Sequence, residues 1–243
     1  MTPRFFIGTS GWAYTTWKPG FYPEGTSAKK FLAFYASRLN SVEVNHTFGS
    51  TLGPGQLQGW LDQAGEGFRF SFKAPQRITH FNRLLNSHEA VAEFFDSLKP
   101  AAKTEKMGLV LFQLPPNFKA DRTRLKGFLD APAFRRKSAP RIAFEFRHAS
   151  WFNDETYSLL RKRGAALCVA ETDDLLTPEV HTADGHACFR MRLAGGYKPK
   201  QIAALAERMR GVAESRDVYV YFRHEDEPTG ALNAAALLRK VGV

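Results

Sequence analysis

Glu145 and Arg147 bring a carboxylate and a guanidinium together at the end of one alternating run of side chains. Between positions 141 and 147, Ile142, Phe144 and Phe146 would face one side of a β-strand, and the charged pair would face the other. Two residues of extended chain separate the pair by roughly 6 to 7 Å. A carboxylate can transfer protons, and a guanidinium binds carboxylate or phosphate groups. The pair therefore indicates a site where this strand ends.

Other strand-like runs show the same division between an apolar side and a polar side. Val42 and Val44 alternate with Glu43 and Asn45, and the run Phe68–Lys73 places three phenylalanines opposite its basic residues. If the apolar sides face surrounding helices, the polar sides face inward and converge where the strands end. The predicted inward set is Glu43, Asn45, Lys73, Gln113, Glu145, Arg147, Arg190, Arg192 and Arg223.

This set favours acid–base chemistry on an anion. Its cations outnumber its carboxylates five to two, so an electropositive pocket is expected, with an anionic small molecule as its ligand. Glu145 is the first choice for a general acid or base, and Glu43 is a second carboxylate as in glycoside hydrolysis. Lys73 is an anion contact or a nucleophile. Arg147, Arg190 and Lys73 are predicted to bind the anion together, close to Glu145.

Two alternatives compete with a ligand site. The charges could instead neutralise one another in a buried ion-pair network that plugs the barrel. A metal site built from Glu43, His46, Glu145, His148 and Asp173 is the less favoured alternative, because the nearby arginines would repel a cation and the spacing matches no metal motif. No metal and no cofactor are predicted.

Four large aromatic residues are candidates for the wall of the pocket. Trp12, Tyr14 and Trp17 occur in a loop rich in turn-forming residues after the first strand, and Trp151 follows the Glu145 strand. They form either a lid over the site or a small core beneath the loop. At least one of the first three is expected to border the mouth of the barrel, with Trp151 on the opposite wall.

Helical runs separate the strand-like runs, which indicates parallel strands. The strands are expected at 5–8, 41–45, 68–73, 108–113, 141–146, 166–170, 187–192 and 217–222, with no convincing helix between the sixth and the seventh. This pattern predicts one α/β domain over residues 1–243, a (β/α)8 TIM-type barrel that is irregular between strands six and seven. An open doubly wound sheet is the alternative, but no G-x-G-x-x-G loop follows the first strand.

Composition narrows the class of protein. The 243 residues carry a formal net charge of +10, which suggests anionic partners, and nucleic acid is less favoured than a small anion because the basic residues are dispersed. Cys168 and Cys188 lie in apolar runs and are expected to be buried free thiols. No apolar stretch is long enough to cross a bilayer, and a cytoplasmic protein without membrane partners is expected.

Several short segments carry a family resemblance. They are Gly8–Trp12 with Trp17 and Phe21–Pro23, Ser41–Asn45 with Thr47–Phe48, Phe70–Pro75 with Ile78–His80, Phe112–Pro116, and Glu145–His148 with Ser150–Phe152. Together they resemble the DUF72 (YecE-like) family of TIM-barrel proteins, whose activity is unassigned. The resemblance implies a fold and not a reaction. It weakens after residue 152, where Met191-Arg-Leu193 replaces the family's x-His-Gly after Arg190 and Arg223–Asp226 replaces an Asn-rich run.

Three functions therefore compete. The leading hypothesis is a hydrolase or lyase that acts on an anionic small molecule. The second is a protein that binds or processes nucleic acid, and the third is a barrel that binds a ligand without catalysis. Positive charge concentrated in the mouth of the barrel would favour the first, and a basic stripe wider than one pocket would favour the second.

Overall fold

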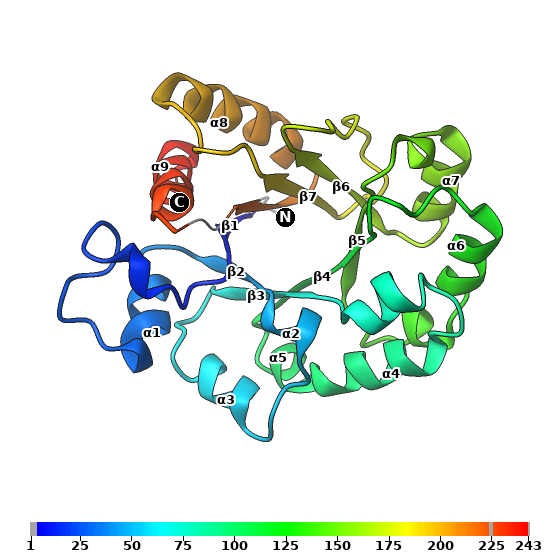
Figure 1. Ribbon diagram of the computed structural model, residues 1–243, viewed down its shortest axis with the longest axis horizontal. Coiled ribbons are helices and arrows are strands. Elements are labelled where there is room, and N and C mark those ends of the chain that lie inside the picture. Colours follow the sequence, from blue (N-terminus) through cyan, green and yellow to red (C-terminus); the bar gives the residue numbers. More distant parts are fainter. Residues whose placement is uncertain (1–3, 224–225, 243) are drawn as a thin grey trace.

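Eight parallel strands close one barrel in the computed structural model, which describes residues 4–223 and 226–242. The strands are β1 (Phe5–Ser10), β2 (Ser41–Val44), β3 (Arg69–Lys73), β4 (Met107–Gln113), β5 (Arg141–Glu145), β6 (Ala166–Glu171), β7 (His186–Met191) and β8 (Asp217–Phe222). Each pairs with its neighbour in chain order, and β8 pairs with β1 (Figure 1). The TIM-type barrel predicted from the alternation of runs is confirmed.

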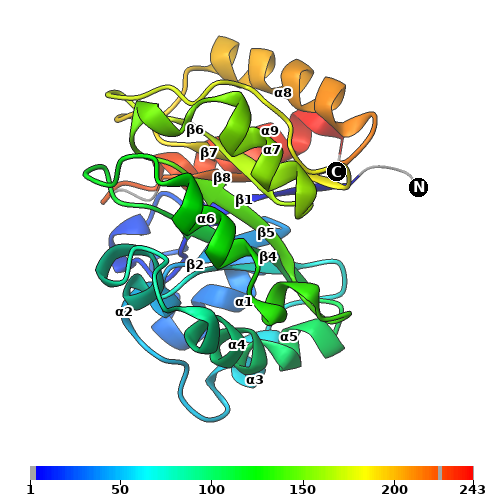
Figure 2. The same cartoon turned by 90° about the vertical axis from the view of Figure 1, so that its right-hand side faces the viewer.

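The helices form a ring outside the strands (Figure 1). They are α1 (Phe31–Ala36), α2 (His46–Gly49), α3 (Gln56–Leu61), α4 (His88–Ser97), α5 (Lys99–Lys103), α6 (Arg122–Leu129), α7 (Asp154–Lys162), α8 (Pro199–Ala213) and α9 (Thr229–Val241). The side view shows α6 and α7 next to each other on the outer face of the barrel (Figure 2). The described segment between β6 and β7 contains no helix, as the sequence predicts. No helix in the described part of the chain has the length and apolar character of a membrane span.

The two sides of each strand have separate packing partners. Phe112 and Phe144 stack with ring centroids 5.2 Å apart on the outer side, and Phe128 of α6 meets Phe112 at 5.3 Å. The inner side carries a second apolar cluster that includes Leu111 and Cys168. Successive side chains of a strand point to opposite faces. The outward phenylalanines therefore pack against the helices, and the alternate positions line the interior of the barrel.

A close approach between β1 and β2 requires a glycine. A Cβ atom at Gly8 would lie 1.8 Å from the carbonyl oxygen of Ser41. The side chain of Tyr35 uses the same space, since its hydroxyl accepts a hydrogen bond from the amide of Thr9 at 2.8 Å and donates one to the Ser41 carbonyl at 3.0 Å. These contacts fix β1 and thereby the position of Ser10 at its end.

Ion pairs close the barrel at the end where the strands begin. Asp217 accepts hydrogen bonds from Arg141 at 2.6 Å and from Arg4 at 3.1 Å. The guanidinium of Arg69 lies over the ring of Phe6, at 5.3 Å from its centroid. This end is filled by side chains, so a site is expected at the other end of the barrel, where the strands finish.

The two cysteines lie inside the barrel on neighbouring strands. Cys168 of β6 is paired in register with Cys188 of β7, and their sulfur atoms are 3.4 Å apart. Both are buried and free, as the sequence predicts, and burial raises the pKa of the Cys168 thiol.

The helix α6 begins at a side-chain cap whose contribution can be measured. Asp121 accepts a hydrogen bond from the backbone N–H of Arg124 at 2.9 Å. We expect Asp121→Ala to lower the free energy of unfolding by about 1 kcal/mol, because a helix N–H loses its partner. Urea unfolding measures this loss. Asp184→Ala, at an exposed aspartate outside any helix, is the control and should change stability little, so equal losses would contradict the capping role.

Candidate functional site

Arg190 is the centre of a charged cluster where the strands end. It lies near the end of β7, is 2% exposed, and reaches across the barrel to two strands. Its Nη1 donates to Glu145 Oε2 at 2.5 Å, and its Nη2 donates to Glu43 Oε1 at 2.7 Å. Both carboxylates are fully buried. One guanidinium therefore links β7 to β2 and β5. Its positive charge is paired with carboxylates of the protein.

Glu145 is held as a carboxylate by its neighbours. Its Oε1 accepts a hydrogen bond from Arg147 Nε, so both of its oxygens are in ion pairs. Burial by itself would raise the pKa of Glu145, but the charges of Arg190, Arg147 and Arg192 outweigh burial and lower it to about 2. A carboxyl group with this pKa carries no proton near neutral pH. The geometry therefore does not favour the predicted role of Glu145 as a general acid or base.

Glu43 has one oxygen in the network and one without a partner. Its Oε1 accepts from Ser10 Oγ at 2.8 Å as well as from Arg190, whereas its buried Oε2 has no hydrogen bond among the described residues. Asn45 Oδ1 and Arg190 Nε are also buried and unpaired there. Buried polar atoms usually have partners, so these atoms mark places where a water or a ligand atom would bind.

Ser10 belongs to the cluster but is absent from the inward set predicted from the sequence. In β1, Phe6 and Ser10 lie on the inner side, because they are separated by an even number of residues. The predicted strand ended at residue 8, two positions too early. The alternation of side chains places Ser10 on the same side as Phe6, but the small residues from Gly8 to Gly11 are also typical of a turn.

Lys73 and Arg192 are the cations of the cluster that have no carboxylate partner among the residues described. Lys73 Nζ lies 3.9 Å from the centroid of the Phe48 ring, and Arg192 Nη1 donates to Ser10 Oγ at 3.4 Å. Burial, followed by repulsion from Arg190, lowers the pKa of Lys73 to about 8 and that of Arg192 to about 10. Neither side chain forms an ion pair with a carboxylate among the residues described, and Glu43 and Glu145 offset their desolvated positive charge only in part.

The remaining polar residues of the predicted set lie at the same end of the barrel. Gln113 Oε1 accepts from Arg190 Nη1 at 3.4 Å. Asn45 follows β2 and is half-buried, and Arg223 directly follows β8, where its backbone N–H donates to the Met191 carbonyl. His224 and Glu225, which belong to the divergent run after β8, lie outside the described residues.

Two of the four predicted aromatic residues border this end. The Tyr14 hydroxyl donates to the Ser10 carbonyl at 3.1 Å, and burial and Glu43 raise its pKa to about 12 although Arg192 opposes them. Trp12 is half-buried and lines a cavity of about 430 Å³ together with Tyr14, Asn45 and Trp60. These positions agree with the expectation that the aromatic loop reaches the mouth.

Trp17 and Trp151 belong to the core, so their expected contact with a ligand has to be corrected. Both are fully buried. Trp17 packs against Phe21 and Tyr22, and Trp151 stacks on Phe146 with ring centroids 4.6 Å apart. The Trp151 indole N–H donates to a backbone carbonyl at 2.7 Å. Their large apolar area is used to hold the loops onto the barrel, and no ring face remains for a ligand.

His80 lies near the charged cluster, although it is not among the site residues predicted from the sequence. Its Nδ1 is 2.9 Å from Thr79 Oγ1, and its ring meets that of Phe48 with centroids 4.9 Å apart. Burial, followed by the charges of Lys73 and Arg147, lowers its pKa, so the imidazole is neutral near physiological pH. A lone histidine carries no spacing signal in a sequence, and only the fold brings it to this cluster.

The residues considered for a metal do not assemble. Among residues 4–223 and 226–242, no group of three or more His, Cys, Asp or Glu side chains could hold a metal ion. His148 accepts a hydrogen bond from the backbone N–H of Ser150 in its own loop, and Asp173 accepts one from the backbone N–H of Ala194, which follows β7.

Comparison with known proteins places the chain in a family. A family model described as "Protein of unknown function DUF72" matches residues 6–243. The chain belongs to the DUF72 family. The DUF72 barrel described here is similar to a DUF72 family protein from Thermotoga maritima, with a TM-score of 0.84 and 25% identity over 99% of this chain and 100% of that chain. A DUF72 family protein from Enterococcus faecalis shares the fold, with a TM-score of 0.77 and 18% identity over 99% and 98% of the two chains.

Two curated relatives match over part of their length. The UPF0759 protein YunF of Bacillus subtilis is 29% identical over 167 residues, which cover 65% of this chain and 57% of YunF. The UPF0759 protein YecE of Escherichia coli is 32% identical over 114 residues, which cover 46% of this chain and 38% of YecE. The DUF72 chain thus aligns with little more than half, or less, of each of these relatives.

Proposed function

We propose that this DUF72 barrel binds the anionic group of a small molecule where its strands end, and that it transfers a proton to or from that molecule in a hydrolase or lyase reaction. The supporting observation is the pair Lys73 and Arg192. Both are mostly removed from water and both have a lowered pKa. A mostly buried cation outside any ion pair is costly, and a bound anion would offset that cost.

The ion-pair network has a different part in this proposal. Glu43 and Glu145 share Arg190, and Glu145 also pairs with Arg147, so the formal charges of these four side chains cancel and they form a rigid base under the ligand. The sequence left open whether these charges form a buried ion-pair network or a ligand site. In this proposal both are present at the mouth of the barrel, with the network beneath the ligand. The unpaired Oε2 of Glu43 adds an acceptor for a hydroxyl or amine of the ligand.

Lys73 is the residue we propose for proton transfer. A pKa of about 8 means that the amine gains and loses a proton close to neutral pH, which suits a general acid or base. Glu145 lacks this property because its pKa is about 2. Lys73 therefore takes the general acid or base role that was expected of Glu145. Glu145 instead positions Arg147 and Arg190.

A pH series of anion binding tests the proposal. Sulfate is a suitable probe because its charge does not change near neutral pH. We expect its affinity, measured by calorimetry, to fall at least about fivefold between about pH 6.5 and about pH 9.5, because Lys73 loses its charge as the pH rises through its pKa. A bound anion favours the protonated amine, so the midpoint should lie somewhat above 8. Absence of sulfate binding throughout the series would contradict the proposal.

A further inference from the structure

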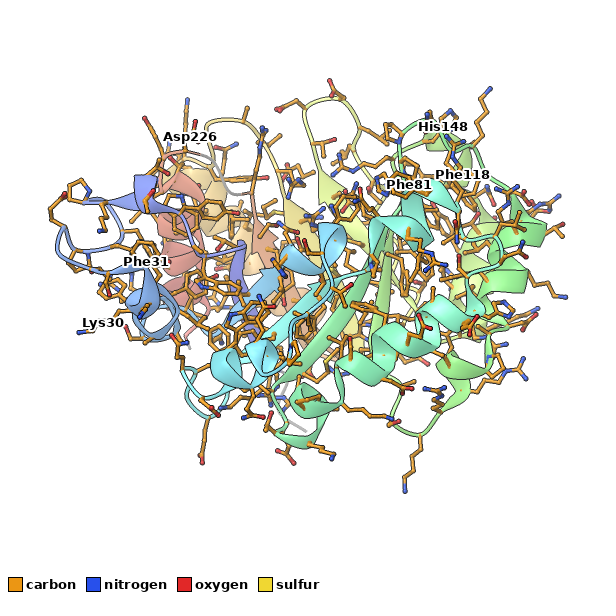
Figure 3. All side chains as sticks on the ribbon, turned by 60° about the horizontal axis from the view of Figure 1, so that its bottom comes forward. Lys30, Phe31, Phe81, Phe118, His148 and Asp226 are labelled. Carbon is orange, nitrogen blue, oxygen red and sulfur yellow. The ribbon has the colours of Figure 1, made fainter. Side chains whose placement is uncertain are left out.

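Phe81 is an exposed aromatic ring in a protein that covers its other phenylalanines. All 21 phenylalanines of the chain lie in described positions, and Phe81 alone is exposed, with 72% of its surface accessible. Figure 3 shows Phe81 with Phe118 and His148 toward one edge of the molecule. His148 follows β5, so this edge is the end where the strands finish. The ring is therefore at the same end of the barrel as the charged cluster.

The backbone around Phe81 is strained and firmly held. The ring comes at the end of a π-helical turn, Arg77–Phe81, and π-helical turns are frequent at functional sites. Arg83, Leu84 and Asn86 then adopt left-handed conformations with φ of 47°, 71° and 48°, which side chains with a Cβ atom rarely accept. Leu84 is buried and its N–H donates to the Ile78 carbonyl at 2.9 Å. The fold thus fixes the segment that carries the exposed ring.

Phe81 borders a cavity that adjoins the cationic part of the site. The cavity has a volume of about 310 Å³, and its apolar wall includes Phe48, Ile78 and Phe94. Thr47 also lines it and donates from Oγ1 to the Lys73 carbonyl at 2.7 Å. Since Lys73 Nζ lies 3.9 Å from the centroid of the Phe48 ring, one aromatic side chain is shared between the cavity and the ammonium group.

The cavity and the mouth differ in charge, so they would bind different groups of a ligand. Arg77 and Glu93 both line the cavity, so their formal charges cancel there. In the mouth, Lys73 and Arg192 form no ion pair with a carboxylate among the residues described, and Glu43 and Glu145 offset their charge only in part. A ligand that spans both regions would place its anionic group against the two cations and its uncharged part in the cavity. Aromatic side chains and a few polar groups, such as Gln76 and Ser50, line that region, which suits a flat ring with polar edges.

We propose that the ligand of this barrel is a small acid that carries an aromatic or heteroaromatic ring, and that the ring occupies the cavity against Phe81 and Phe48 while the acid binds Lys73 and Arg192. This inference rests on the proposed function and names its ligand class. It predicts that removal of the ring from a ligand weakens binding even when the acid is unchanged.

Two probes that differ by a ring test the inference. Adenosine 5′-monophosphate and ribose 5-phosphate share the phosphate and the sugar, and only the first has a heteroaromatic ring. Calorimetry near pH 7 should show that the nucleotide binds at least about tenfold more tightly than the sugar phosphate, in line with the usual strength of stacking on aromatic side chains. Phe81→Ala should reduce this ratio to about twofold or less and leave the affinity for ribose 5-phosphate unchanged.

A control variant on the same strained loop separates stacking from general surface effects. Leu85 is 51% exposed and does not line the cavity, so Leu85→Ala should preserve the ratio of affinities. Equal affinities of the native protein for the two probes would overturn the inference and leave the proposed function intact, provided that sulfate binds as described above. A ratio that Phe81→Ala leaves unchanged would also overturn it. Failure of sulfate and of both probes to bind would reject the proposed function itself.

Discussion

Replacement of Arg190 by methionine is expected to destabilise the barrel by about 3 to 5 kcal/mol, the usual cost of removing one partner from a buried ion pair. Methionine preserves much of the side-chain length but leaves the fully buried Glu43 and Glu145 without their shared cation. Urea unfolding at neutral pH measures the loss. Arg147→Met is the matched control: Arg147 contacts only one of the two carboxylates and is 26% exposed, so a smaller loss is expected.

The pH dependence of this loss identifies its cause. In the native protein the pKa of Glu145 lies below its usual value of 4.5, so its contribution to stability is complete above about pH 4.5 and is lost as the pH falls toward 2. Without Arg190 this carboxyl group should bind protons more readily, and the difference between variant and native protein should shrink in acid. A second variant, Arg190→Met with Glu43→Gln and Glu145→Gln, should recover part of the stability at neutral pH. A loss below about 1 kcal/mol for Arg190→Met would contradict the central position given to this residue.

Most of the fold, and the grouping of charged side chains at one end of the barrel, could be predicted from the sequence because both depend on alternation. The runs around Phe70 and Phe144 place an apolar side chain at every second position, and a closed barrel must then turn the other positions inward. That rule places Glu43, Lys73 and Arg190 at one end of the barrel without specifying their hydrogen-bond or ion-pair partners. The absence of a helix between β6 and β7 could also be predicted, since the sequence there shows no helical period.

Pairing within the site could not be predicted, because alternation does not specify distances across a barrel. The sequence shows that Glu145 faces inward but not that two guanidinium groups occupy both of its oxygens, and these two ion pairs disfavour the acid–base role expected of it. The positions of Trp17 and Trp151 depend on how their loops fold back, which has no period to read. The exposure of Phe81 likewise depends on a π-helical turn whose hydrogen bonds leave no pattern in the sequence.

Replacement of Lys73 by methionine is expected to weaken sulfate binding about tenfold to a hundredfold, since a charged hydrogen-bond donor contributes roughly 1.5 to 3 kcal/mol. The dependence of sulfate affinity on pH between about 6.5 and 9.5 should flatten at the same time, because the amine that titrates in this range is gone. Retention of both the affinity and the pH dependence would remove Lys73 from the site.

The same substitution should stabilise the folded protein in the absence of a ligand. The pKa of Lys73 is lowered from 10.5 to about 8, so the folded state disfavours its charged form. This penalty is complete below about pH 8 and disappears as the pH rises toward 10.5, and at neutral pH Lys73→Met should therefore raise the free energy of unfolding by about 1 to 3 kcal/mol. Lys106→Met is the control at the other end of the barrel, where Lys106 Nζ donates to the carbonyls of Leu61 and Ala64 at 2.7 Å. It should lower stability and leave sulfate affinity unchanged. A gain in the free energy of unfolding for Lys73→Met and a loss for Lys106→Met would show that Lys73 lacks the hydrogen-bond partners that Lys106 has. Equal losses for the two variants would show that Lys73 supports the fold instead.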